Sequence, residues 1–133
     1  MYSTQIVYRF EYPRGRGIYH RDDRRSVADL FTMDLSRHPV PDCDSKLAPM
    51  LSGMPDSEFK TYYFGFCSIE QLRNWFYSDE LLKKLHAKGV VIAEYECRVA
   101  DVLEGHTQAM FVRANSFGKE QYDILHYFKL EGE

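Results

Sequence analysis

The sequence predicts a single α+β domain, and three observations carry that prediction. The chain has 133 residues, which is the usual size of one domain. Stretches rich in β-branched and aromatic residues are separated at first by helical patterns, but the last three follow one another directly. Consecutive strands of this kind favour an antiparallel or mixed sheet. Because no repeat, linker or low-complexity tract interrupts the sequence, residues 1–133 are expected to form one domain.

Five segments are predicted to be strands. Valine, isoleucine, threonine and aromatic residues dominate them, and these residues fit a pleated, half-buried surface. Turn-forming residues or helical patterns bound each one. The five segments are residues 4–10, 59–66, 90–99, 107–113 and 122–130.

Capping residues predict one short helix and a pair of helices. Ser68 and Gln71 form a capping box ahead of an apolar face. Ser78 begins a second helix, with acidic residues in its first turn and lysines towards its end, and Gly89 ends it. Residues 26–33 begin with a serine and predict the short helix.

Two stretches are predicted to be irregular. Residues 11–25 contain Pro13, Gly15 and Gly17 and are expected to form a loop. Residues 34–56 contain four prolines and one glycine, and no apolar period survives there. An irregular connection of this length is uncommon and is usually a functional lid or a disordered segment.

The charge is unevenly distributed along the chain. The net charge is −3, yet residues 9–25 hold six arginines and no lysine. Arginine without lysine favours bidentate recognition of carboxylate or phosphate, although a solvated loop with local Arg–Asp pairs explains the run equally well. The acidity of the whole chain argues against a nucleic-acid partner. The six are Arg9, Arg14, Arg16, Arg21, Arg24 and Arg25.

The sequence predicts a cytoplasmic protein that does not enter a membrane. No apolar run reaches the length of a membrane span, and the N-terminus lacks the pattern of a signal peptide. The three cysteines are odd in number and widely spaced, so no disulfide framework is expected. Cys67 and Cys97 lie in apolar runs and are expected to behave as small buried hydrophobes.

Several kinds of chemistry have no signature here. The sequence has no phosphate-binding P-loop motif. Its five histidines show no ligand spacing, so no metal site is predicted. A nucleophilic pair between Cys67 and a histidine stays open, but nothing local supports it.

Three polar side chains on strand faces are candidates for chemistry. Alternation places Glu94 and Glu96 on one face of their strand. Two carboxylates can serve acid–base chemistry when burial separates their pKa values, but a solvated strand face is the interpretation we favour. Gln108 lies on the more apolar side of its strand and needs hydrogen-bond partners. Those partners are either a ligand's hydroxyl groups or, more simply, neighbours at the start of the strand.

Three patches resemble the ADP-ribosyltransferase fold, which bacterial mono-ADP-ribosylating toxins, poly-ADP-ribose polymerases and small phage proteins share. In IVYRF, the Tyr–Arg dipeptide that ends at Arg9 is similar to the one ending the toxins' first strand. In YYFGFCSIEQLRNWF, Tyr63, Phe64 and the helix led by Ser68 resemble the family's second motif. VIAEYECRV followed by TQAMFV resembles the penultimate and catalytic strands. The likeness covers roughly residues 4–113.

The chain departs from this family at one important position. The family's catalytic strand opens with a glutamate that bonds the ribose 2′-hydroxyl and stabilises the transition state, and Gln108 stands in its place. Relatives without the glutamate either transfer a single ADP-ribose or are inactive. A second alignment takes Glu94 and Glu96 as the toxins' E-x-E motif, with Arg9 and Ser68 as partners. That alignment leaves the last two strands unexplained.

The resemblance implies a binding site for NAD as co-substrate. Arg9 would hold the diphosphate or ribose, and Tyr63 or Phe64 would stack on nicotinamide. The loop around Gly15 and Gly17 would approach the cofactor closely, because glycine has no side chain. A carboxylate at one of the two strand glutamates would stabilise positive charge on the ribose.

Three functions are therefore to be compared. The first is a mono-ADP-ribosyltransferase that modifies a protein target. The second is a non-catalytic interaction protein, such as a phage-encoded inhibitor of a host protein complex, since tyrosine and tryptophan dominate interface hot spots. The third is a protein that binds NAD or another nucleotide without the chemistry. Gln108 in place of the glutamate favours the second and third.

Overall fold

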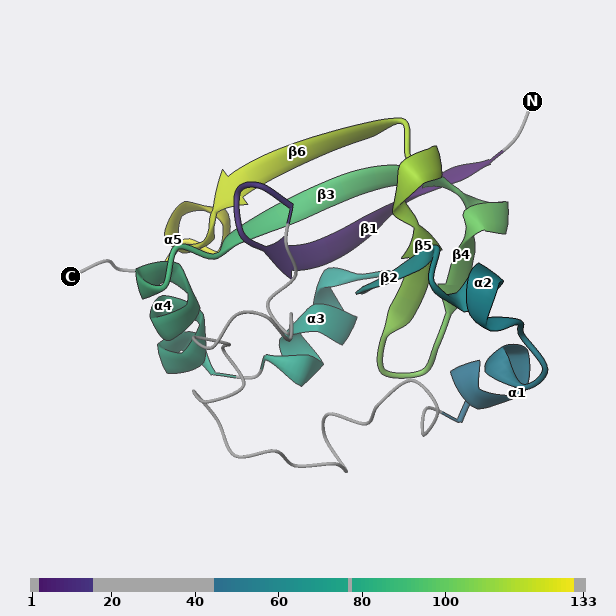
Figure 1. Cartoon of the computed structure of the whole chain (residues 1–133). Helices are drawn as coiled ribbons and strands as arrows, with labels where there is room; N and C mark the ends of the chain where they lie inside the picture. The colour runs from purple at the N-terminus through teal and green to yellow at the C-terminus, as the bar shows by residue number, and fades with distance from the viewer. Residues whose placement is uncertain (1–2, 16–44, 77, 131–133) are drawn as a thin grey trace.

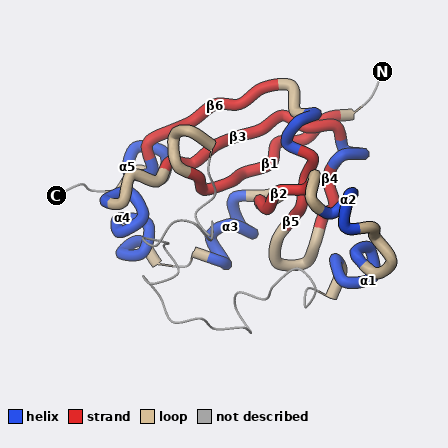
Figure 2. Tube along the Cα trace, viewed as in Figure 1, coloured by secondary structure: helices blue, strands red, loops and turns tan. Residues whose placement is uncertain are grey.

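The structure is a computed structural model that describes residues 3–15, 45–76 and 78–130. These residues form two three-stranded antiparallel sheets and several short helices, so the fold class is α+β, as the sequence predicts (Figure 1). Figure 2 shows α4 and α5 at one end of the strands, α1 and α2 at the other end, and α3 beneath the strands between them.

The first sheet contains the longest strands. Its order is β1 (Thr4–Glu11), β3 (Val91–Arg98) and β6 (Gly118–Asp123), with β3 in the centre. Both neighbours of β3 run antiparallel to it, and Arg9 lies opposite Ala93. The predicted strands at residues 4–10 and 90–99 are confirmed.

The second sheet is smaller, and β5 (Ala109–Val112) lies between β2 (Tyr62–Gly65) and β4 (Val102–Glu104). An antiparallel bridge between Tyr8 and Phe66 ties it to β1, with N–O distances of 2.8 and 2.7 Å. The predicted strand at residues 107–113 is confirmed, and the one at 59–66 is confirmed in its second half.

An apolar cluster joins the two sheets. Val7, Ala93 and Cys97 from the first sheet are buried against Phe111 from the second. The chain approaches closely at Gly65, where a Cβ atom would lie 2.7 Å from Val7 Cγ1 and 2.9 Å from the Tyr8 carbonyl oxygen. A side chain at this position would push the sheets apart.

Helices cover the opposite face of the first sheet. They are α3 (Ile69–Trp75), α4 (Asp79–Ala87) and α5 (Ile124–Tyr127), and they bury a larger apolar cluster against the strands. Among its members, Phe10 and Ile92 come from the sheet. The described chain also contains α1 (Leu47–Leu51), α2 (Asp56–Phe59) and the 3-10 turns Val99–Asp101 and Arg113–Asn115.

The predicted caps of the helix pair are confirmed. The Ser68 hydroxyl accepts the Gln71 backbone N–H at 3.0 Å, and Ser78 accepts from Leu81 at 3.2 Å. Gly89 follows α4 with a φ of +87°, in the left-handed region that glycine tolerates. The N–H groups of residues 89 and 90 then bond back to the last turn, the pattern of a Schellman motif.

Two sequence predictions are wrong within the described residues. The last strand is β6, and residues 124–127 of the predicted strand at 122–130 form α5 instead, because Asp123 caps the His126 N–H at 3.0 Å. Residues 45–56 of the predicted irregular stretch contain α1. The predicted helix at 26–33 and the rest of that stretch lie outside the described residues.

Candidate functional site

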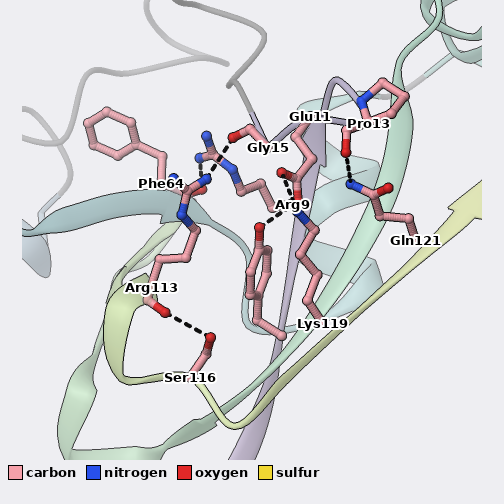
Figure 3. Close-up of polar contacts among 10 residues, drawn as sticks. Arg9, Glu11, Pro13, Gly15, Phe64, Arg113, Ser116, Lys119 and Gln121 are labelled. Atoms are coloured by element: carbon pink, nitrogen blue, oxygen red, sulfur yellow. Dashed lines mark hydrogen bonds and ion pairs between the residues drawn. The ribbon is translucent and has the colours of Figure 1, made fainter.

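A basic pocket opens where the turn after β1 meets the connection from β5 to β6. Its volume is about 330 Å³. Arg14, Gly15, Arg113, Phe117 and Lys119 are among the residues that line it. Figure 3 shows the polar side chains gathered at this turn.

Two hydrogen bonds hold the turn in place from distant parts of the chain. Arg113 Nη1 donates to the Gly15 carbonyl oxygen at 2.6 Å. Gln121 Nε2 donates to the Pro13 carbonyl oxygen at 3.0 Å (Figure 3). The position of Arg14 on the pocket wall therefore depends on residues about a hundred positions later in the chain.

Charged atoms converge on Gly15, whose φ is +92°. A Cβ atom built there would lie 3.2 Å from Arg113 Nη1, 3.4 Å from Lys119 Nζ and 3.4 Å from Glu11 Oε2. Glycine is needed here for two reasons, the left-handed backbone and the crowding. Two cations and one carboxylate thus surround a single point of the pocket floor.

Glu11 is a fully buried carboxylate below this point. Its Oε1 accepts a hydrogen bond from the Tyr95 hydroxyl at 2.6 Å, and its Oε2 lies 3.6 Å from Lys119 Nζ. Oε2 has no hydrogen-bond partner among the described residues. Burial, followed by the bond to Glu11, raises the pKa of Tyr95, so its phenol stays a proton donor.

The guanidinium groups of two arginines pack against the ring of Tyr63. Arg113 Cζ lies 4.0 Å from the ring centroid, and Arg9 Cζ lies 5.3 Å from it. Arg9 is 7% exposed, and its Nη1 donates to the Phe64 carbonyl oxygen at 2.8 Å. Burial lowers the pKa of Arg9, while Glu11 acts in the opposite direction. These contacts are of the cation–π kind.

The pocket carries a local excess of positive charge. Its described surroundings contain four cationic side chains and one carboxylate, on a chain whose net charge is −3. A concave surface of one charge sign concentrates ligands of the opposite sign. The arrangement therefore suits an anion, and guanidinium groups add bidentate geometry for phosphate or carboxylate. The cations are Arg9, Arg14, Arg113 and Lys119, and the carboxylate is Glu11.

The structure brings some of the predicted NAD-binding residues together. Arg9 contacts Tyr63 through its guanidinium and Phe64 through the backbone. Gly15 lies in the adjacent pocket. Gly17 lies outside the described residues.

Other predicted site residues lie elsewhere. Gln108 is 4% exposed and alternates with Met110, which puts it on the face of the second sheet opposite Tyr63. Ser68 caps α3. Figure 1 shows α3 under the sheets, away from the turn after β1.

The two strand glutamates bond to neighbouring side chains. The Tyr127 hydroxyl donates to Glu94 Oε2 at 2.6 Å, and the Thr4 hydroxyl donates to Glu96 Oε2 at 3.2 Å. Both glutamates alternate with Tyr95, so they lie on the face of β3 opposite the pocket.

Sequence reasoning missed Glu11, Tyr95, Arg113 and Lys119 as parts of one site. The arginine at 113 ends the predicted strand at 107–113, the lysine at 119 lies between two predicted strands, and neither belongs to a polar motif. The sequence did hold one signal for a buried charge. Glu11 ends β1 on the face that also carries the buried residues Val7 and Arg9. A buried glutamate needs a cationic or hydrogen-bonding partner, but the sequence does not name it.

No metal-binding group is apparent in the part of the chain that the structure describes, where no three His, Cys, Asp or Glu side chains cluster. The described residues also contain no helix long and apolar enough to cross a membrane.

Fold and site define the class of this protein as a small α+β protein with a cationic pocket beside the turn that follows β1. The chain belongs to the bacteriophage T4 Y00F protein family, whose sequence model matches residues 1–125. The family match suggests that it is a phage protein. Searches of curated proteins and of solved structures found no match. The resemblance to ADP-ribosyltransferases therefore stays a prediction.

Proposed function

We propose that this phage protein binds a small phosphate-bearing ligand in its basic pocket and transfers no group from it. The observation that carries the proposal is the convergence of Arg113 and Lys119 on the turn that presents Arg14. Charge-assisted hydrogen bonds from such groups are stronger than neutral ones. NAD, which the sequence resemblance suggests, is the first ligand to test.

The size of the pocket supports a small ligand. Its volume of about 330 Å³ lies at the lower end of the range for small-molecule sites. A diphosphate with part of the attached nucleoside fits this scale. The acidic chain as a whole disfavours an extended polyanion, because most of its surface would repel one.

The positions of the acidic side chains support binding without transfer. Cleaving the glycosidic bond of NAD needs a negative group where positive charge develops on the ribose. Among the residues that the structure describes, Glu11 is the carboxylate next to the pocket, but it is buried and holds Tyr95 and Lys119. Glu94 and Gln108 lie on other faces.

A second candidate function is the capture of an acidic side chain of a host protein, so that the chain acts as a non-catalytic interaction protein. The same cations pair well with carboxylates. Phe117 at the pocket rim is 47% exposed and offers apolar contact area beside them. This candidate replaces the first if phosphate compounds do not bind.

Calorimetry with pyrophosphate, ADP and NAD tests the proposal. We expect measurable binding, and we expect Arg14→Gln to weaken it roughly tenfold or more, since a hydrogen bond to a charged group is lost. Arg14 is exposed, so the variant should fold. Arg73→Gln is the matched control, because Arg73 lies on α3 and pairs with Asp79.

The same experiment separates binding from catalysis. The wild type should release no nicotinamide from NAD. Gln108→Glu should not create this activity, because residue 108 lies away from the pocket. Release by the wild type would establish the transferase instead. A complete lack of binding by all three compounds would remove the phosphate proposal.

A further inference from the structure

We infer that the ligand of the basic pocket is a mononucleotide, whose base stacks on Phe117 while its phosphates contact Arg14, Arg113 and Lys119. This inference rests on the proposed phosphate binding and adds the chemical class of the rest of the ligand. Its basis is an aromatic ring that lies at the rim of the same pocket.

Phe117 is held in place by its backbone. Its N–H donates to the Glu96 carbonyl oxygen at 2.8 Å, which ties it to β3. The preceding residue, Ser116, bonds through both its N–H and its hydroxyl to the Arg113 carbonyl oxygen, at 3.0 and 2.7 Å. The ring therefore stands on a fixed turn, and less freedom is lost when a ligand covers it.

The environment of the ring suits a planar partner. Phe117 is 47% exposed although it lies among charged groups. Arg98 Cζ lies 5.4 Å from its centroid, so a guanidinium already packs against the ring. A nucleobase can stack on the exposed part, and stacking on aromatic side chains is a common way to bind bases of any sequence.

The spacing of ring and cations matches one nucleotide. Phe117 immediately precedes β6 and comes two positions before Lys119, so their Cα atoms lie no more than about 7 Å apart. Both residues line the same pocket. Lys119 Nζ and Arg113 Nη1 both lie close to the point where a Cβ atom of residue 15 would stand. A base on the ring would thus place its own phosphates near the cations. Inorganic phosphate or an acidic peptide would leave the ring uncovered.

The test compares pyrophosphate with ADP by calorimetry on the full chain. We expect ADP to bind more tightly than pyrophosphate by roughly 5-fold to 100-fold, which is the range of stacking contributions. Phe117→Leu should reduce the affinity for ADP much more than the affinity for pyrophosphate. Phe59→Leu is the matched control, because Phe59 is 37% exposed on α2, away from the pocket.

The possible outcomes distinguish mononucleotide binding from the binding of phosphate alone. If ADP binds no more tightly than pyrophosphate, the nucleotide assignment is overturned while phosphate binding stands. If an oligonucleotide binds far more tightly than ADP, the ligand is single-stranded nucleic acid and the mononucleotide is overturned. If neither ADP nor pyrophosphate binds, both proposals fail. Equal thermal melting of the two variants and the wild type shows that folding is intact.

Discussion

The two faces of the first sheet differ sharply although the same strands supply both. On β1, Phe10 points to the helix-covered face, where the described cluster is apolar. Its neighbours Arg9 and Glu11 point to the other face, where they form a buried charged network with Tyr95. One face thus supplies stability through packing, and the other gives up some apolar burial for a charged site.

The largest effect should come from the charged face, at Glu11. In Glu11→Leu the Tyr95 hydroxyl and the Lys119 ammonium lose their buried partner, so we expect a loss of about 3–5 kcal/mol in the free energy of unfolding. Urea denaturation measures it. Glu96→Leu serves as the control, because Glu96 is exposed on the same sheet, and a change within about 0.5 kcal/mol is expected. Equal losses would contradict a buried charged network.

A cavity made in the apolar cluster on the helix-covered face should lower the stability of the protein. Leu72 is fully buried on α3, and Leu72→Ala should lower the free energy of unfolding by about 2–5 kcal/mol. Because the pocket lies on the other side of the sheet, the fraction that stays folded should bind pyrophosphate as the wild type does. A tenfold loss of affinity in fully folded variant protein would show that the two faces are not independent.

Gly15→Ala should affect both stability and the pocket. The new methyl group would lie 3.2 Å from Arg113 Nη1, and the left-handed backbone adds strain of about 1–3 kcal/mol. Gly53 offers a control, since its φ is also positive but no atom lies within 4 Å of the added methyl. The two variants share the strain, so a greater loss of pyrophosphate affinity in Gly15→Ala reports the crowding alone. Equal affinities would place the ligand away from this point.

The smallest effect is the pH dependence of stability that comes from the Cys97 thiol, which is buried between the two sheets. Burial raises the pKa of Cys97 from 9.0 to about 11. Because the folded-state pKa is the higher one, the stabilising effect of the neutral thiol is complete below pH 9 and is lost as pH rises through 11. Thermal melting between pH 8 and 11 should therefore fall less steeply in Cys97→Ala than in the wild type. Parallel slopes would contradict the raised pKa.

The features that the sequence predicted are those in which neighbours along the chain determine the structure. Ser68, Ser78 and Gly89 each act on backbone groups within a few residues, so their roles could be inferred locally. The helix-covered apolar face follows from the same short-range periodicity. The sequence prediction missed one local signal at α5, where Asp123 caps the His126 N–H and a β-rich segment forms a helix.

The pocket could not be predicted in the same way. Arg113 meets Gly15 across 98 positions of sequence, and Tyr95 meets Glu11 across 84. No motif spacing records such contacts, because they arise only when distant segments of the chain come together in the folded sheets. The arginine-rich run had two equal interpretations, anion recognition and a solvated loop, and Arg9 and Arg14 belong to it. Its partners at residues 113 and 119 came from the structure alone.

Mapping pyrophosphate binding by amide NMR tests the central claim most directly, because it shows both whether and where an anion binds. The account predicts that the largest shift changes fall on the backbone amides of Gly15, Arg113 and Lys119, and that the amides of α4 on the helix-covered face do not move. Shift changes that are absent, or that centre on α4, would contradict an anion site in the basic pocket.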